Sequence, residues 1–513
     1  MKGALESRVL PKIRSLGSIL QPINRLPKDI FIRIPRFFVN EKGGHNYETF
    51  PMNKPLITMT HVCRSWRNVL LSTPTLWTQI DFSTSEYKQA MGFLGRSGGL
   101  PLDIHQFFES EDDMEPFLST TLRNIHRLRS LDITSLLDYL ERVLTRFTRP
   151  APELKHLTIS NDSNTTDRDM KLHSTIFEGQ LPKLTSLTLN YIHTNLRDFN
   201  FPSLTRFTFL TRTKISVRDL TSFFERCPSL EFIQICLSYM PQPPTAPPRR
   251  RIRLAALQEL RLDQTACATG LLDHLVLPKC TEVILKGQFT GEAFDKYDSP
   301  APRIHPSSID QLPVTRGITK AVAMPNSCVL SGPNGNLRFW CFEGVRRNFD
   351  AGFFTSFSPI SVLQITELWV GQRTQSHFWG GKSRPWEQTV AGVCGAFEVL
   401  TKVEDLTIVS CETEPFFTTL GATVDDEILL PGLQSLTIYV GHGDLDVPTL
   451  VQCAKMRKEG SQPLGEVTVV FEKDPGDDVM QEVESVREFV GELFNCVGKA
   501  PKLSWLDEDC DSW

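Results

Sequence analysis

Apolar residues recur in one fixed pattern along most of this chain. The pattern is clearest in Pro152–Ile159, which reads Pro-Glu-Leu-Lys-His-Leu-Thr-Ile, and it returns at 182–189, 202–209 and 228–235. Each copy begins with proline and carries apolar residues at relative positions 3, 6 and 8. Alternation of apolar and polar residues is typical of a short strand with one buried face. The pattern therefore predicts one strand in every copy.

Looser copies extend this pattern in both directions. They start at Leu128, Leu257, Cys280, Ile365, Val403, Leu433 and Leu464. From Leu128 to Cys280 the copies follow one another at intervals of 20 to 30 residues, close to the roughly 20–29 residues of leucine-rich repeats. A single unit cannot bury its apolar face, whereas stacked units share a continuous core. We therefore predict an α/β fold in which residues 76–513 form a curved leucine-rich-repeat solenoid with a parallel sheet on its concave face.

The pattern weakens around residues 290–360. Glycine and proline accumulate there, for example in Ser-Gly-Pro-Asn-Gly-Asn at 331–336. Such residues mark turns and loops rather than regular elements. We expect an irregular insertion in this part of the repeat domain.

Residues 22–75 follow a helical pattern instead. Pro27 stands where a first helical turn begins, a position at which its missing N–H removes no helical hydrogen bond. Ile30 and Ile34 lie four residues apart and therefore on one helix face. Pro35 is expected to end this helix, because proline disrupts a helix interior.

Two further short helices and a strand are expected after this first helix. The helices should lie at 56–60 and 62–70, and the alternation over 76–82 predicts the strand. Trp77 is expected to seal the end of the repeat stack. Residues 1–21 carry basic residues among leucines and isoleucines and are interpreted as a short amphipathic lead-in segment.

The N-terminal motifs together resemble an F-box. They read Leu-Pro-x-Asp-Ile from Leu26, Val-Cys-Arg-x-Trp-Arg from Val62 and Ser-Thr-Pro-x-Leu-Trp from Ser72. The segment that continues to Asp103 resembles the F-box-like proteins common in fungi. In that family the module binds the small Skp-type adaptor of cullin–RING ubiquitin ligases, and the repeats hold the substrate. The resemblance implies an adaptor-binding set of Leu26, Pro27, Ile30, Ile34, Val62, Cys63 and Trp66.

This sequence departs from the compact form of the F-box motif in two places. Leu26 and Val62 are 36 residues apart, a longer separation than in the compact motif, and Ile34-Pro35 replaces the usual phenylalanine. An alternative role for Leu26, Ile30 and Trp66 is to cover the end of the repeat stack, since solenoids need such caps.

The concave face of the predicted sheet is the expected substrate surface. The residues that alternate with the strand leucines lie on that face. From Arg206 onward they include arginine and aromatic side chains, which dominate the energetics of protein interfaces. The candidate substrate-binding residues are Arg206, Phe232, Arg261, Trp369 and Tyr439.

Composition favours neither nucleic acid nor a membrane as a partner. The 513 residues are 40% hydrophobic and 22% charged, with a formal net charge of −5, so no basic excess would attract phosphate groups. No uninterrupted apolar stretch approaches the ~18–20 residues of a membrane span. We expect a protein of the cytoplasm, the nucleus or both.

Several common motifs for catalysis or metal binding are missing from the sequence. It has no complete phosphate loop, no His-Glu-x-x-His and no Gly-x-Gly-x-x-Gly. Its twelve cysteines include no Cys-x-x-Cys pair, which argues against a zinc site. Several, such as Cys63 and Cys280, occupy positions that predict buried free thiols. We expect neither an enzyme nor a cofactor.

Three functional hypotheses follow. The first is a substrate-recognition subunit of a cullin–RING ubiquitin ligase, which binds a Skp-type adaptor through residues 22–75 and an unidentified protein substrate through the repeats. The second is a repeat scaffold without ligase function, in which the F-box-like segment is a structural cap. The third is a hydrolase or transferase inserted within residues 290–400, which would require a pocket with converging titratable groups.

Overall fold

The computed structural model has a mixed α/β fold. It describes Ile23 and residues 26–40, 54–82, 87–108, 110–162, 170–173, 176–211, 215–237, 250–263, 271–287, 312–324, 327–341, 364–371, 396–410, 413–424, 427–440 and 445–498. These residues form two compact units, which divide between Leu204 and Thr205. The described residues include seventeen strands of a large, mostly parallel sheet. Five of these strands belong to the first unit and twelve to the second. The predicted lead-in segment, 1–21, lies outside the described residues.

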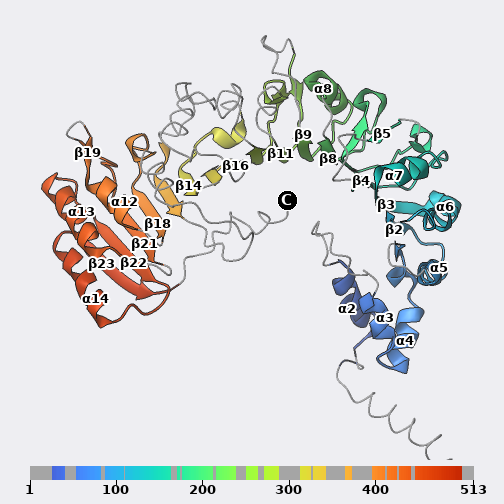
Figure 1. The fold of residues 1–513 in the computed structure, drawn as a ribbon, viewed down its shortest axis with the longest axis horizontal. Coiled ribbons are helices and arrows are strands. Elements are labelled where there is room, and N and C mark those ends of the chain that lie inside the picture. Colours follow the sequence, from blue (N-terminus) through green and yellow to red (C-terminus); the bar gives the residue numbers. More distant parts are fainter. Residues whose placement is uncertain are drawn as a thin grey trace, which may run out of the picture. The chain divides into compact units, whose positions relative to one another are not determined.

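A helical module opens the first unit (Figure 1). Its elements are α2 (Lys28–Asn40), α3 (Lys54–Thr60), α4 (Arg64–Leu71) and the 3-10 turn η2 (Pro74–Leu76). The two short helices expected after the first are confirmed. The expectation that Pro35 ends the first helix is wrong, because α2 continues through Pro35 to Asn40. Proline removes one backbone hydrogen bond here, and the burial of Pro35 and of Phe31 one turn earlier holds the helix in place.

The sheet of the first unit has five parallel strands. They are β1 (Gln79–Asp81), β2 (Leu102–Phe108), β3 (Leu128–Ser135), β4 (His156–Asn161) and β6 (Ser186–Asn190), paired in that order. Their apolar residues are in register, so that Leu131, Leu157 and Leu187 are direct neighbours and are all buried. The strand expected over 76–82 is confirmed in its second half only, because η2 occupies the first residues.

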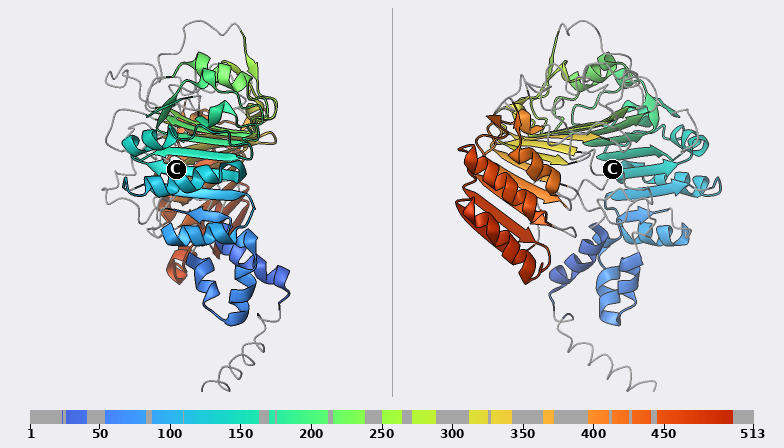
Figure 2. Two further views of the ribbon diagram at one scale, coloured as in Figure 1. Left: turned by 90° about the vertical axis from the view of Figure 1, so that its right-hand side faces the viewer. Right: turned by 60° about the vertical axis from the view of Figure 1, so that its left-hand side comes forward.

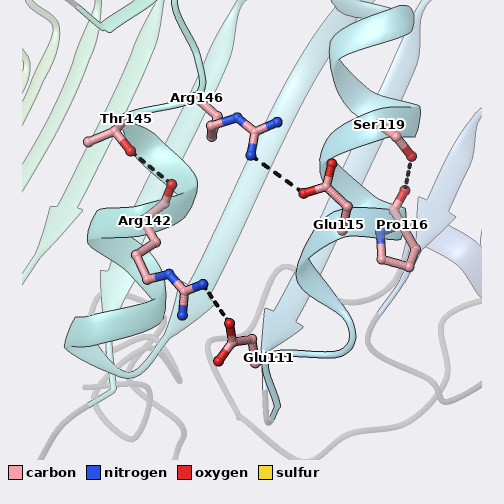
Figure 3. Close-up of polar contacts among 7 residues, drawn as sticks. All are labelled: Glu111, Glu115, Pro116, Ser119, Arg142, Thr145 and Arg146. Atoms are coloured by element: carbon pink, nitrogen blue, oxygen red, sulfur yellow. Dashed lines mark hydrogen bonds and ion pairs between the residues drawn. The ribbon is translucent and has the colours of Figure 1, made fainter.

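Helices cover the leucine side of this sheet (Figures 1 and 2). They are α5 (Tyr87–Arg96), α6 (Met114–Arg123) and α7 (Leu137–Leu144). Ion pairs join α7 and its C-terminal end to the region of α6: Arg142 Nη2 lies 2.5 Å from Glu111 Oε1, and Arg146 Nη1 lies 3.4 Å from Glu115 Oε2 (Figure 3). Exposed pairs of this kind contribute little to stability, so the buried leucines carry most of the packing energy.

The sheet of the second unit has twelve strands. In spatial order they are β8 (Arg206–Thr211), β9 (Phe232–Leu237), β11 (Glu259–Asp263), β13 (Glu282–Gly287), β16 (Gly335–Cys341), β15 (Ser327–Gly332), β14 (Lys320–Met324), β17 (Glu367–Gly371), β18 (Asp405–Ser410), β21 (Ser435–Val440), β22 (Glu466–Phe471) and β23 (Glu492–Val497). Only β15 runs antiparallel to its neighbours. The described part of the predicted irregular insertion, residues 312–341, is therefore built into the sheet as β14, β15 and β16.

Helices also cover one side of the second sheet, as Figure 2 shows for α12, α13 and α14. The described helices of this unit are α8 (Val217–Glu225), α12 (Glu414–Gly421), α13 (Val447–Glu459) and α14 (Asp477–Glu484). Short strand pairs among the described residues are β5 (Met170–Leu172) with β7 (Ile192–Thr194), β10 (Ile252–Arg253) with β12 (Leu275–Val276), and β19 (Thr423–Val424) with β20 (Glu427–Ile428).

A strand is present at every position where the repeating pattern predicts one. Pairing keeps equivalent positions together: Leu406, Leu436 and Val467 are neighbours on adjacent strands, and all three are buried. Each such side chain stabilises the fold by about 1.5–3 kcal/mol. The alternating polar positions consequently lie on the opposite side of the sheet, which no described helix covers.

Candidate protein-binding surfaces

The helical module has a small apolar core of its own. Phe31 is 5% exposed and meets Trp66 edge-on, with ring centroids 4.8 Å apart. Leu56 of α3 and Leu70 of α4 are also buried. Phe31 was not singled out in the sequence, although its spacing from Pro35 could have indicated a buried helix face. Trp66, predicted as a docking residue, is half-buried in this arrangement.

Apolar side chains remain at the surface of this module after its core is filled. Leu26 is 38% exposed, Ile30 39% and Val62 58%. We refer to these three residues as the N-terminal apolar surface. Pro27 is exposed as well, and Ile34 is half-buried. Burial of such side chains against a second protein would be favourable, since apolar area removed from water contributes about 25 cal/mol per Å².

Cys63 acts as a helix cap. Its Sγ accepts a hydrogen bond from the backbone N–H of Trp66 at 3.4 Å, at the start of α4. Arg67 Nε donates to the carbonyl of Thr60 at 2.9 Å and ties α4 to the end of α3. The expectation that Cys63 is fully buried is wrong, because a capping side chain at a turn stays partly open to solvent. These contacts fix the turn that carries Val62.

Trp77, expected to seal the end of the repeat stack, is buried between α4 and α5. Its Nε1 donates to the carbonyl of Leu70 at 2.8 Å, and its ring meets Phe93 edge-on at 4.6 Å. The guanidinium of Arg96 lies 5.0 Å from the centre of the Trp77 ring. The indole thus links α4 to α5 with both its apolar ring and its polar atom.

A histidine lies between two carboxylates on the polar side of the first sheet. His105 pairs in register with Asp81 on β1 and with Asp132 on β3. His105 Nδ1 is 3.3 Å from Asp132 Oδ2. Burial lowers the pKa of His105, but the hydrogen bond and charge of Asp132, together with the charge of Asp81, outweigh it and raise the pKa above 6.5. The sequence pattern alone did not show this cluster, because its members come from different strands.

Replacing Asp132 with asparagine is expected to lower the pKa of His105, because the carboxylate favours the imidazolium. A raised native pKa means that this group stabilises the fold at low pH and loses that contribution as pH rises through the native pKa. The histidine ring resonances, followed by NMR against pH, measure the shift. An unchanged titration in Asp132→Asn, with His156 as the internal control, would contradict this assignment.

The first three predicted substrate-binding residues gather on the polar face of the second sheet. The guanidinium of Arg206 lies 4.1 Å from the ring centre of Phe232, and that of Arg261 lies 5.3 Å from the same centre. Phe232 is only 6% exposed beneath them. The arginines, rather than Phe232, therefore present this cluster to a partner.

The remaining two predicted residues form a second cluster on the same sheet. The rings of Trp369 and Tyr439 are nearly parallel, 19° apart in plane, with centroids separated by 6.4 Å. Trp369 Nε1 donates to Glu367 Oε1 at 2.9 Å, which orients the indole. Both rings are half-buried, so their remaining surface is open on the polar face.

Ser97 and Cys280 are two side chains of nucleophilic type among the described residues. Gly95-Arg-Ser97-Gly-Gly99 fits Gly-x-Ser-x-Gly, but it begins in the last two residues of helix α5 instead of joining a strand to a helix. Ser97 is buried, and its hydroxyl donates to the carbonyl of Leu94 at 2.7 Å. Burial raises the pKa of Cys280 to about 12, so this thiol stays protonated and is a poor nucleophile.

No cluster of three or more His, Cys, Asp or Glu side chains within the described ranges is placed to hold a metal ion. Among the helices described, none has the length and apolar character to cross a bilayer. Compared with known proteins, the chain matches no protein-family model and no curated protein.

Proposed function

We propose that this protein is the substrate-recognition subunit of a cullin–RING ubiquitin ligase. Its helical module, residues 22–75, would bind a Skp-type adaptor, and residues 76–513 would form a leucine-rich-repeat solenoid that binds a protein substrate. In this role the chain breaks and forms no bonds and acts by proximity. It would work in the cytoplasm, the nucleus or both.

The N-terminal apolar surface is the observation that carries this proposal. Phe31, Leu56 and Leu70 already fill the core of the module, so Leu26, Ile30 and Val62 are not needed to close it. A surface of this kind on a small helical module is typical of a site that meets an apolar groove in a partner. The F-box resemblance of the same residues supplies the identity of that partner.

Trp77 favours a second candidate function. It joins α4 to α5 through a buried ring and a hydrogen bond, and this contact supports a module that would cover the end of a repeat domain. A scaffold with such a cap and no ligase role would keep the contact of Trp77 with α4 and α5 but would not bind the adaptor. Adaptor binding therefore separates the two functions.

Co-purification of the full chain with the Skp-type adaptor tests the proposal. We expect capture by the parent protein and at least a tenfold loss in Leu26→Ala/Ile30→Ala, because the two truncations remove apolar contact area worth more than about 1.4 kcal/mol. Leu136→Ala is the matched control, since Leu136 is an equally exposed leucine, at 47%, elsewhere in the first unit.

The control should bind the adaptor like the parent protein. Loss of binding in Leu136→Ala as well would attribute the effect to general destabilisation. No capture by the folded parent protein would support the scaffold function instead.

A further inference from the structure

The charges on the polar face of the second sheet are paired with one another over β11–β16. Arg261 forms an ion pair with Glu259 of the same strand, and Arg338 Nε lies 2.5 Å from Glu282 Oε1. Asn336 Nδ2 also donates to Glu282 Oε2 at 3.0 Å. This part of the face therefore satisfies its own charges and offers no strong preference for a charged partner.

The same face is acidic over β17–β23. Strand pairing places five residues in one row, namely Glu367, Asp405, Ser435, Glu466 and Glu492. Lys320 Nζ lies 2.5 Å from Glu367 Oε2 and neutralises that carboxylate. Within the described residues, Asp405, Glu466 and Glu492 are all exposed and take part in no ion pair. Three negative charges on strands about 5–10 Å apart thus remain unbalanced.

The neighbouring carboxylates also affect Asp405. Desolvation raises the pKa of its carboxyl group, the charges of Glu367, Glu404 and Glu466 raise it further, and Lys320 acts in the opposite direction. A positively charged partner would relieve this repulsion, because an opposite charge favours the ionised carboxylate.

Aromatic side chains stand directly beside the acidic row. Trp369 lies two residues beyond Glu367 on β17, and its ring stacks with that of Tyr439. At the far strand, Phe494 lies two residues beyond Glu492 and is 49% exposed. Thr437 and Thr468 lie on the strands between them, in the same register row as Trp369 and Phe494.

We propose that the β17–β23 face binds a lysine- or arginine-rich segment of a protein. Carboxylates beside an indole ring suit such side chains, since cations interact both with the carboxylates and with aromatic faces. Phosphorylated segments and nucleic acids are disfavoured, because their charge has the same sign as that of the row. The inference rests on the proposed function only in naming this segment as part of the substrate.

Direct titration with synthetic peptides tests the proposal. The probes are a fluorescein-labelled 16-residue peptide with alternating lysine, arginine, glycine and serine, its serine-phosphorylated form, and a peptide with glutamate in place of the cations. We expect anisotropy to report saturable binding of the cationic peptide to the full chain, weaker binding after phosphorylation and none for the glutamate peptide. The affinity should fall as salt is added, because exposed charges are screened.

Two variants define the site. Asp405→Lys/Glu466→Lys reverses the row and is expected to weaken the cationic peptide at least tenfold. Trp369→Ala is expected to weaken it about 3- to 10-fold through loss of the cation–π contact. The matched control is Glu459→Lys/Glu482→Lys, which makes the same change in net charge at exposed positions on α13 and α14 and should bind within about twofold of the parent.

Equal losses in the face variant and the control would overturn the proposal, because only net charge would then matter. Equal binding of the cationic and glutamate peptides would overturn it too. Thermal unfolding of every variant verifies folding. Adaptor capture by the same proteins separates this inference from the proposed function: peptide binding without adaptor binding would refute the ligase role and leave this site standing.

Discussion

Replacing Arg457 with methionine is expected to lower the free energy of unfolding of the second unit by about 3–5 kcal/mol. Arg457 is fully buried, on helix α13. Its Nη1 donates to the carbonyls of Leu420 at 3.2 Å and Leu429 at 2.8 Å, and its Nη2 donates to the carbonyl of Leu430 at 2.8 Å. Methionine fills much of the space but leaves all three carbonyls without these donors.

The position of these carbonyls explains why a cationic side chain is their hydrogen-bond donor. Leu420 belongs to the last turn of α12, where unpaired carbonyls give the helix end a partial negative charge. Leu430 has a left-handed backbone, with φ of 50°, and its carbonyl accepts from the backbone N–H of Leu433 at 3.1 Å as well as from the guanidinium. Burial lowers the pKa of Arg457, yet its guanidinium stays charged at neutral pH.

Urea unfolding of the full chain measures the effect. Lys455→Met is the matched control, because Lys455 is exposed on the same helix, and it should change the free energy by less than about 0.5 kcal/mol. Arg457→Lys should fall between the two, since a single ammonium cannot reach all three carbonyls. A change below about 1 kcal/mol in Arg457→Met would contradict this account.

Truncating Trp77 is the second change with a large expected effect. Trp77→Ala should destabilise the first unit by about 3–5 kcal/mol, because it leaves a cavity between α4 and α5. Trp77→Phe should have a smaller effect of about 1–2 kcal/mol, because the ring is kept and the hydrogen bond to the Leu70 carbonyl is lost. Urea unfolding measures both, with Leu136→Ala as the exposed control. Equal effects of the two substitutions would indicate that the hydrogen bond, and not the packing of the ring, stabilises the contact between α4 and α5.

The strand positions could be predicted because they depend on a local and repeated feature. At Leu157, Leu187 and Leu436, alternation with polar residues marks one buried side, and pairing in register requires the same spacing in each copy. Strands β2, β14, β15, β16 and β23 were not predicted. For β14 and β15 the reason is that their run of small and apolar residues lacks a polar alternation.

The helical module was predicted in its elements and only partly in its details. Leu26, Ile30 and Val62, which are predicted to dock, are exposed. The length of α2 could not be predicted from the sequence. An internal proline destabilises a helix, and the sequence does not show that burial of Pro35 offsets this cost. Phe31 illustrates the same limit, since its partner Trp66 is 35 residues away.

Long-range features could not be predicted from a single sequence. Arg457 stands among exposed lysines and glutamate near the end of α13, and only its contacts with distant carbonyls reveal that it is buried. The acidic row likewise arises because pairing aligns Asp405 with Glu466 and Glu492 across intervening strands. Each acid taken alone is an ordinary surface residue.

Amide hydrogen exchange of the full chain, free and saturated with the Skp-type adaptor, tests the central claim most directly. A docked N-terminal apolar surface predicts slower exchange in α2 and in the turn between α3 and α4, with β18, β21 and β22 unchanged. Leu26→Ala/Ile30→Ala should abolish this protection at the same adaptor concentration. Exchange in α2 that is identical with and without the adaptor would contradict the claim.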